Sequence, residues 1–342
     1  MNKKQKIKRI IIISIFILVI TTSCVFYKPI EKFFINFFNT KFNVVFKEDN
    51  LMVHFINVGQ GDAIAINLPN DEVLLIDAGP LNSNATLSNY LKEKVLNASK
   101  NDNIDYLILT HADEDHCMGT QKVLNEFDVE KVFIPTVDGK ENYKNLKNFV
   151  VNNYEYEILS RELQLNISNC KIEIFGLYEY ADTNESSAIV KITYLEKSFL
   201  FMADVSSTIE TLLINEYGAK LDCDVLKVAH HGSKYSSCLE FLKIVTPDYS
   251  VISVGRNAYG HPTQTVLNNL RAVNSKILRT DINGNILFTV GKDYDLNCNY
   301  GNFVVSGFLV DYRIFVLVID GFMIFLIIKI LFKKPKNKHK TN

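Results

Sequence analysis

The chain has 342 residues, of which 47% are hydrophobic and 22% are charged, and its formal net charge is −1. This composition excludes a disordered or fibrous protein and allows one large domain or two ordinary ones. Residues 51–300 hold 33 acidic against 21 basic side chains, a net of −12, so this segment lacks the electrostatic footprint of a nucleic-acid-binding surface.

The N-terminal segment is apolar from residue 10 to residue 27 and follows a run of lysines and an arginine. A span of this length behind basic residues predicts a signal anchor or transmembrane helix over residues 1–28, with a signal peptide as the alternative. Residues 29–50 are then a juxtamembrane linker.

Short apolar runs alternate with helical stretches from about residue 51, which predicts one domain over residues 51–300. The first three runs are separated by turn-forming residues, so we expect antiparallel pairing among them. Two mixed sheets flanked by helices account for the order that follows. Strands are predicted at 53–58, 63–66, 73–76, 106–110, 131–134, 171–175, 188–194, 199–202, 225–228 and 251–254, and helices at 118–127, 142–152, 206–217, 236–244 and 263–271.

The stretch Thr-His-Ala-Asp-Glu-Asp-His at residues 110–116 follows a predicted strand and carries two imidazoles among three carboxylates. Extended geometry would place His116 on the opposite face from His111 and Asp113, so the chain must curl after the strand for these side chains to meet. A helix that begins near residue 118 would end that curl. Acidic residues in a turn can simply cap the next helix, but histidines interleaved with aspartates favour a metal site.

A second apolar stretch covers residues 312–332, between a linker at 301–311 and a basic tail at 333–342. It predicts a second transmembrane helix, although Asp320 in its middle is costly in a membrane and leaves a buried or interfacial helix as the alternative. Lysines at both ends of the chain predict, by the positive-inside rule, that both termini are cytoplasmic. The domain between them would be extracytoplasmic, with the lipid bilayer as a partner.

Seven motifs lie in order over residues 51–292. They are Val-His-Phe-Ile-Asn-Val-Gly-Gln-Gly-Asp at 53–62, Leu-Ile-Asp-Ala-Gly at 75–79, the motif at 110–116, Asn-Glu-Ser-Ser at 184–187, Phe-Leu-Phe-Met-Ala-Asp at 199–204, Leu-Lys-Val-Ala-His-His-Gly-Ser at 226–233 and Tyr-Gly-His-Pro at 259–262. With these motifs the chain resembles metallo-β-lactamase-fold hydrolases, specifically the extracytoplasmic hydrolase domain of the ComEC competence proteins, without their many-helix channel region. The resemblance implies an α+β fold, a four-layer αββα sandwich, here flanked by N- and C-terminal transmembrane helices.

The resemblance also implies a centre of one or two metal ions, Zn²⁺ or Mn²⁺. One ion would be bound by His111 and Asp113, and the hard oxygen ligand of Asp113 suits Mn²⁺ as well as Zn²⁺. The sequence has no third His for that ion, so a single tightly held ion is the alternative. The second ion would be bound by Asp115, His116 and one His of an adjacent pair, His231 or else His230, and Asp204 would bridge the two ions.

Other residues receive roles near that centre from the same resemblance. Asp77 would orient His111, and Asp62 would brace the turn at 59–61, although a purely structural role suits both. His261, in the Gly-His-Pro loop, would protonate the leaving group and would share the catalytic role with Asp115. The candidate substrate contacts are Asn184, Ser187, Ser233 and Lys234, and the last two could equally form a polar helix start.

The function implied by the resemblance is a membrane-anchored metal-dependent hydrolase that cleaves phosphodiester bonds with a metal-bound hydroxide. Its substrate would be a small-molecule or nucleic-acid phosphodiester. The alternatives are a DNA nuclease accessory to DNA uptake, an ester, lactam or lipid-headgroup hydrolase, and a non-catalytic, metal-stabilised extracytoplasmic binding module. The acidic domain disfavours the nuclease, and the sequence indicates no protein partner.

Overall fold

The computed structural model describes residues 49–97, 102–161, 163–178, 180, 182–300, 303–305 and 308–310. The predicted transmembrane segments at 1–28 and 312–332, the basic tail and most of both linkers lie outside the described residues. Within the described ranges, no helix has the length and apolar character needed to cross a membrane.

The chain divides into two compact units. The larger unit comprises residues 43–300 and contains the predicted domain. The smaller unit comprises residues 1–42 and 301–342. In the smaller unit, β16 (Phe303–Val305) pairs antiparallel with β17 (Phe308–Val310).

The first sheet of the larger unit has eight strands in the order β15-β14-β1-β2-β3-β4-β5-β6. Strands β1, β2 and β3 pair antiparallel, which confirms the pairing expected for the first three predicted runs. From β3 to β6 the pairing is parallel. The strands are β1 Leu51–Phe55, β2 Ile64–Asn67, β3 Val73–Ile76, β4 Ile104–Ile108, β5 Val129–Ile134, β6 Glu155–Ile158, β14 Ile286–Val290 and β15 Leu296–Tyr300.

The second sheet has seven strands in the order β13-β12-β11-β10-β9-β8-β7. It is antiparallel from β7 to β10 and parallel from β10 to β13, so both sheets are mixed, as predicted. The strands are β7 Gln164–Ile167, β8 Cys170–Gly176, β9 Ala188–Tyr194, β10 Lys197–Phe201, β11 Val225–Lys227, β12 Tyr249–Ile252 and β13 Lys276–Arg279.

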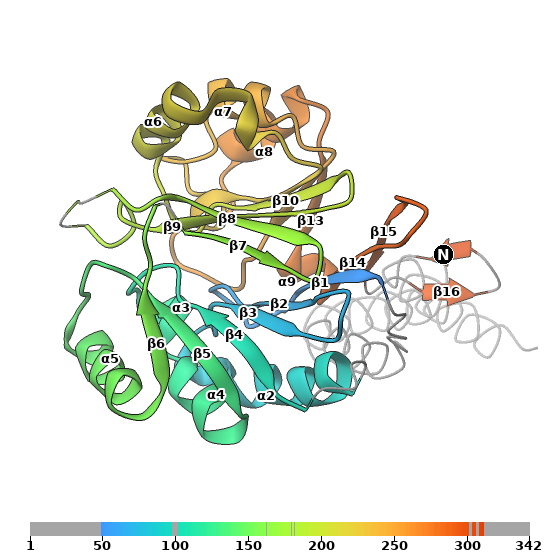
Figure 1. Cartoon of the computed structure of the whole chain (residues 1–342). Helices are drawn as coiled ribbons and strands as arrows, with labels where there is room; N and C mark the ends of the chain where they lie inside the picture. The colour runs from blue at the N-terminus through green and yellow to red at the C-terminus, as the bar shows by residue number, and fades with distance from the viewer. Residues whose placement is uncertain are drawn as a thin grey trace, which may run out of the picture. The chain divides into compact units, whose positions relative to one another are not determined.

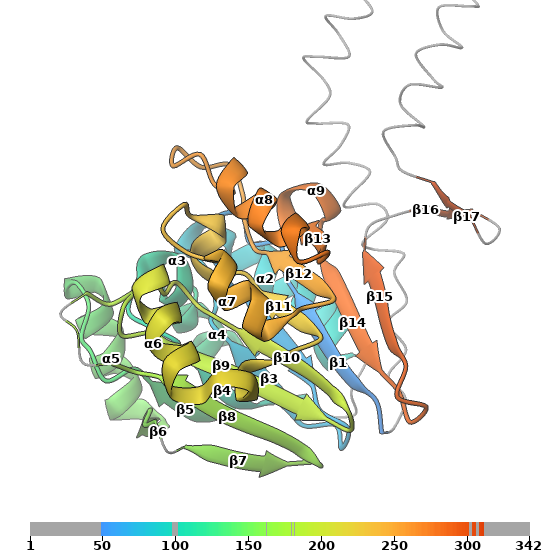
Figure 2. The same ribbon diagram turned by 90° about the horizontal axis from the view of Figure 1, so that it is seen from above.

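Helices cover the outer face of each sheet (Figures 1 and 2). Those packed on the first sheet are α2 Asn84–Tyr90, η2 Leu91–Leu96, α4 Thr120–Glu126 and α5 Glu141–Asn153. Those packed on the second sheet are α6 Ser207–Tyr217, α7 Leu239–Val245 and α8 Gln264–Ala272. The short helices are η1 Leu81–Ser83, α3 Glu114–Cys117, η3 Gly218–Leu221, η4 Ala229–Gly232 and α9 Thr280–Asn283.

Apolar side chains fill the space between the sheets and between each sheet and its helices. Between the sheets, the Phe55 ring lies 5.9 Å from that of Phe201, and the Phe199 ring lies 6.1 Å from that of Phe288. Full burial of one such side chain contributes roughly 2–3 kcal/mol to folding. The larger unit therefore has the predicted α+β fold, with two packed sheets between outer helices.

The parallel strands of both sheets bring several polar loops to their C-terminal ends. In the first sheet, β3 leads into Asp77 and β4 leads into the motif at 110–116. In the second sheet, β10 leads into Asp204 and β11 leads into η4 with its two histidines. Ligand sites in sheets of this kind form beyond the carboxyl ends of the strands, so this edge is where a functional site is expected.

Candidate metal centre

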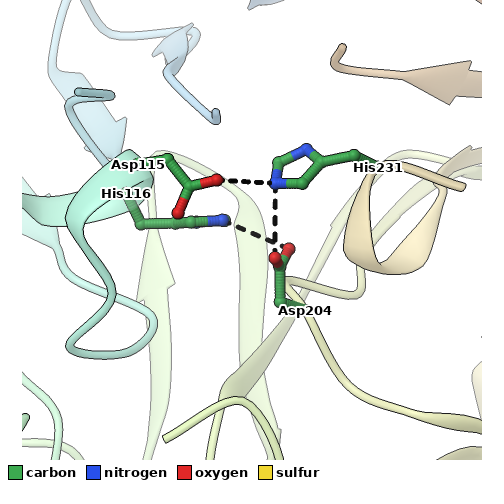
Figure 3. A group of neighbouring side chains, drawn as sticks. All are labelled: Asp115, His116, Asp204 and His231. Carbon is green, nitrogen blue, oxygen red and sulfur yellow. Dashed lines mark ion pairs between the residues drawn. The ribbon is translucent and has the colours of Figure 1, made fainter. Parts of the chain in front are cut away.

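Four side chains converge where the two sheets meet at this edge (Figure 3). Asp115 and His116 come from α3, Asp204 follows β10, and His231 lies in η4. Each offers one ligand atom, and these atoms all lie within 4.8 Å of one another. His231 Nε2 is 3.3 Å from Asp115 Oδ2 and 3.2 Å from Asp204 Oδ2, and His116 Nε2 is 3.2 Å from Asp204 Oδ1.

Three of these atoms are buried without a hydrogen-bond partner among the described residues. His116 Nε2, His231 Nε2 and Asp204 Oδ1 make no hydrogen bond within the described part of the chain. Buried polar atoms without partners are rare in folded proteins and need an explanation. Imidazole nitrogens and carboxylate oxygens are the ligands of Zn²⁺ and suit Mn²⁺, so the donor set fits a divalent metal ion.

The opposite nitrogen of each imidazole is fixed by an acceptor. His116 Nδ1 donates to Asp77 Oδ2 at 2.7 Å, and His231 Nδ1 donates to the Ser253 carbonyl at 2.7 Å. Both acceptors require the proton on Nδ1, which leaves Nε2 free as the ligand atom. Such bonds hold metal-binding imidazoles in one tautomer and one orientation.

Asp77 differs from its predicted role. It accepts from His116, and it also accepts from the Thr110 backbone N–H at 2.8 Å and the Thr110 hydroxyl at 2.7 Å. Thr110 Oγ1 in turn lies 3.0 Å from His111 Nδ1, so Asp77 reaches His111 only through Thr110. The reason is that α3 curls back over the end of β3, where the Ala78 N–H donates to the His116 carbonyl.

The helix α3 provides the curl that the motif requires. It begins at Glu114, directly after Asp113, and is followed by α4, the helix predicted at 118–127. Its first turn presents Asp115 and His116 from one side, which extended geometry could not do. Gly61, at φ +132°, packs on this turn so closely that a Cβ would lie 2.1 Å from the Asp115 carbonyl oxygen.

Several residues of the centre have left-handed backbone. Asp77, Ala203, His230 and His231 have φ values of 56°, 45°, 49° and 53°. Each such residue costs about 1–3 kcal/mol, and this strain persists where the surrounding structure holds it, typically at functional sites. In η4 it turns the two adjacent imidazoles by 79° to each other.

His231, and not His230, joins the group of four. The His231 side chain is 2% exposed, whereas that of His230 is 31% exposed with Nε2 3.9 Å from Asp204 Oδ2. His230 lies instead beside His261, with ring centroids 5.7 Å apart. The structure thus brings His231 of the pair into the group of four and leaves His230 at its partly exposed rim.

The buried carboxylates strongly affect the pKa values of the centre. Burial lowers the pKa of His231, but Asp204 and Asp115 outweigh burial and raise it to about 10. The pKa of His116 is well above its usual value for the same reason, with Asp204 the strongest carboxylate. Burial raises the pKa of Asp204, but His231 and His116 outweigh it and hold this pKa well below its usual range. In the metal-free protein, protons on both imidazoles therefore offset the negative charge of the carboxylates. A bound divalent cation would take over that role.

The two residues predicted for the other ion do not join the group of four. His111 is buried with its ring 4.2 Å from that of His116, and its Nε2 makes no hydrogen bond within the described ranges. Burial, followed by His116, lowers the pKa of His111 to about 4. Asp113 lies at the N-terminus of α3, where its Oδ1 accepts from the Thr183 hydroxyl at 2.5 Å. His111 is thus available beside the centre, whereas Asp113 is bonded to the loop before β9.

The segment before β9 lies against the metal motif. The Ala188 N–H donates to the Thr110 carbonyl at 3.0 Å. Asn184 Oδ1 and Ser187 Oγ are buried and make no hydrogen bond to any described residue. These two predicted substrate contacts therefore have uncommitted polar atoms close to the end of β4.

Asp62 lies at the base of the centre and does more than brace the neighbouring turn. Its carboxylate forms an ion pair with Lys227 and lies 3.8 Å from His116 Nδ1 and 3.7 Å from His231 Nδ1. Lys227 is fully buried, and sequence reasoning did not single it out. The available signal was a lone cation inside the apolar run of β11, a position that demands a buried partner.

The rim contains the remaining predicted residues. His261 Nδ1 is buried and makes no hydrogen bond to the described residues, and burial followed by His230 lowers the pKa of His261. Ser233 is buried and its carbonyl accepts from Ser236, so its role includes a structural one. Lys234 is exposed, with its ammonium 4.8 Å from the centre of the Tyr235 ring.

Comparisons with known proteins identify the family of the chain. The model of the metallo-beta-lactamase superfamily matches residues 56–256. ComE operon protein 3 of Bacillus subtilis (strain 168) is 31% identical over 258 residues, which cover 69% of this chain and 32% of that protein. Competence protein ComA of Neisseria gonorrhoeae is 29% identical over 248 residues, covering 72% and 33%. The chain spans about a third of the length of these relatives.

Among solved structures, the metallo-beta-lactamase fold protein YhfI from Bacillus subtilis aligns with a TM-score of 0.44 and 12% identity, over 67% of this chain and 95% of its own. The family model alone covers more than half of the present chain. Together with the two competence proteins, it shows that the chain belongs to the metallo-β-lactamase superfamily and is ComEC-like.

Proposed function

We propose that this protein is a membrane-anchored, metal-dependent hydrolase of phosphodiester bonds. The observation that carries the proposal is the convergence of Asp115, His116, Asp204 and His231 within 4.8 Å, in which buried atoms of the last three make no hydrogen bond to the described residues. Zn²⁺ or Mn²⁺ would be held by His116 Nε2, His231 Nε2 and oxygens of the two aspartates. One ion would be enough to bind all four of these side chains, and His111 would help to hold a second ion.

A bound divalent ion would lower the pKa of water toward about 7 and stabilise negative charge that develops on the substrate. The residues around the ion would orient the imidazoles and leave one side open to solvent. Asp77 and the Ser253 carbonyl hold the two imidazoles, and the side chain of Asp115, 33% exposed, marks the side from which solvent reaches the group. His261 at the rim is the candidate to protonate the leaving group, since its Nδ1 has no competing partner among the described residues.

The phosphodiester is the finer part of the proposal. The Ser187 hydroxyl, which has no hydrogen-bond partner among the described residues, and the exposed ammonium of Lys234 would donate to phosphate oxygens, and Asn184 Oδ1 would accept from a substrate hydroxyl. The relatives include proteins named for competence and for recombination, which favours nucleic acid as a second candidate substrate. The net charge of −12 over residues 51–300 favours a short or small phosphodiester over a long duplex.

The location is also proposed. The apolar stretches at 10–27 and 312–332, each next to basic residues, support two membrane segments with cytoplasmic termini and an extracytoplasmic domain.

The activity is tested with the full chain in detergent, bis-p-nitrophenyl phosphate and either Mn²⁺ or Zn²⁺. We expect turnover that is lost on chelation and in the double variant Asp115→Ala/His116→Ala. Glu114→Ala is the matched control, because Glu114 lies in the same short helix but is exposed and bonds Asn142. Turnover that survives the double variant would contradict the metal mechanism.

Substrate choice separates the candidate functions in the same assay. Cleavage of bis-p-nitrophenyl phosphate and of a small dinucleotide, but of neither a lactam nor a carboxylic ester, supports a phosphodiesterase. Faster cleavage of single-stranded oligonucleotides would favour the nuclease. Metal binding with thermal stabilisation but without turnover of any substrate would favour a binding module.

A further inference from the structure

Lys227 is a fully buried lysine directly beneath the metal centre. It is the last residue of β11, and its ammonium donates to the Ala203 carbonyl at 2.9 Å. The same ammonium forms an ion pair with Asp62 and lies 3.6 Å from Asp204 Oδ1. One side chain thus contacts the main chain just before a candidate ligand, the ligand itself and a neighbouring carboxylate.

We propose that Lys227 is a positioning residue that holds Asp204, and through Asp62 the two imidazoles, in the geometry that binds metal. The inference rests on the metal centre of the proposed function. It extends that function by assigning a role to a residue that touches neither the metal nor the substrate.

The first step of the argument concerns the backbone before Asp204. Ala203 has φ 45°, a conformation that an alanine rarely adopts and that the surroundings must maintain. Its carbonyl is held by two donors, Lys227 Nζ and the His230 N–H at 3.0 Å. Loss of the ammonium removes one of the two bonds that fix the direction in which Asp204 leaves β10.

The second step concerns competition for the imidazole N–H groups. Asp62 lies 3.8 Å from His116 Nδ1 and 3.7 Å from His231 Nδ1, whereas the actual acceptors of these groups, Asp77 and the Ser253 carbonyl, are at 2.7 Å. Lys227 pairs with Asp62 Oδ2, the oxygen nearest His116 Nδ1, and offsets the charge of a carboxylate that faces both imidazoles. Without that cation, Asp62 becomes a buried, unpaired carboxylate that attracts both N–H groups and rotates the rings.

Removing Lys227 changes metal affinity in two opposite ways, through lost charge repulsion and through lost positioning. A measurement of affinity therefore distinguishes them. An ammonium repels a divalent cation a few ångströms away, so its removal by charge alone would tighten metal binding. Loss of positioning would weaken binding, and changes in residues that orient metal ligands typically cost about 10- to 100-fold in affinity. If metal binds more weakly after the positive charge of Lys227 is removed, the cause is therefore the lost positioning of the ligands.

The experiment measures Zn²⁺ and Co²⁺ affinity of the full chain in detergent by competition with a chelator. We expect Lys227→Met to bind about 10- to 100-fold more weakly and to shift the visible absorption of bound Co²⁺, because the ligand geometry changes. Lys191→Met is the matched control. Lys191 is also buried and donates to two carbonyls, of Lys220 and Asp222, but has no contact with the centre, so it should lower stability and leave affinity unchanged within about twofold.

A second variant covers the case in which Lys227→Met fails to fold. Lys227→Met/Asp62→Leu removes both charges, leaves no unpaired buried carboxylate and should fold. It still lacks the bond to Ala203, so we expect binding at least about tenfold weaker than in the wild type. Unchanged or tighter binding with an unchanged Co²⁺ spectrum in either variant overturns the positioning role while the metal centre stands. A wild-type chain that binds no metal overturns both the inference and the proposed function.

Discussion

His230 and His231 are adjacent in sequence, yet only one of them is in a position to bind metal. Both have left-handed backbone, which turns their rings to different sides. His231 enters the buried group with Asp204 and Asp115, whereas His230 stays partly exposed beside His261. A sequence pattern cannot separate the two, because the choice depends on two backbone angles set by the packing of η4.

His231→Ala is therefore expected to weaken metal binding by at least about 100-fold, since it removes a ligand and not merely an orienting group. His230→Ala should change metal affinity by no more than about twofold and serves as the matched control. Isothermal titration with Zn²⁺ measures both. Equal losses in the two variants would show that both imidazoles bind.

The pH dependence of metal binding follows from the raised pKa values of His116 and His231. Both imidazoles are protonated in the metal-free protein at neutral pH and must lose a proton to bind metal. We expect affinity to rise with pH by up to about tenfold per pH unit for each proton released. Calorimetry in buffers of different ionisation enthalpy counts these protons, and no proton release at pH 7 would contradict the assignment.

His116 and His231 also determine how the stability of the metal-free protein changes with pH. A histidine with a raised folded pKa stabilises the metal-free protein fully below its unfolded pKa of about 6.5, and this contribution is lost as pH rises toward about 10 for His231. Metal should consequently raise Tm by more at pH 8 than at pH 6.

At the level of elements, α6 and α7 are joined by a buried carboxylate. Glu210 in α6 accepts from the backbone N–H of Ser237 at 2.5 Å and of Cys238 at 2.9 Å, at the start of α7. These two hydrogen bonds fix the segment at Ser237 and Cys238, which follows η4. Burial raises the pKa of Glu210 to about 7.

Glu210→Ala leaves two buried N–H groups without an acceptor and should lower the free energy of unfolding by about 2–4 kcal/mol at pH 5. A raised carboxyl pKa means a contribution that falls as pH rises from about 4.5 to 7, so the difference between wild type and variant should shrink over that window. Glu216→Ala is the control on the same helix, because Glu216 is exposed and pairs with Arg161 at the surface, where loss costs at most about 1 kcal/mol. Urea unfolding at several pH values measures both, and a constant difference would contradict the titration of Glu210.

The elements that sequence patterns predicted are those with strong periodicity. Buried runs such as β3 and β9 were predicted with the bounds that the structure shows, because most of their residues are apolar or β-branched. The strands β6 and β7, whose side chains are largely exposed or half-buried, were not predicted, and neither were β13, β14 and β15, although β14 is buried. Pairing with β5 and β8 makes β6 and β7 strands, and that pairing has no local signal.

At the level of the whole molecule, the proposed topology puts the acidic domain and the two basic segments on opposite sides of a membrane. Leu81 is 67% exposed in the larger unit and gives a labelling position there. We expect Leu81→Cys to react with a membrane-impermeant maleimide in intact cells, beyond the background of the native cysteines. Labelling only by permeant reagents, or only after permeabilisation, would place the domain in the cytoplasm.

The sequence by itself determined the residue types of the centre and the class of fold. Histidines and aspartates after an apolar run indicate a metal site, and the alternation of runs and turns indicates an α+β domain, because both signals are local. Only the tertiary structure decided which atoms meet. His231 over His230, Thr183 as the partner of Asp113, Asp77 as the partner of His116, and Lys227 beneath Asp204 all depend on contacts between segments 23 to 70 residues apart in the sequence, or on neighbours with unusual backbone angles. Packing fixes those contacts through burial and strained backbone, neither of which a local pattern encodes.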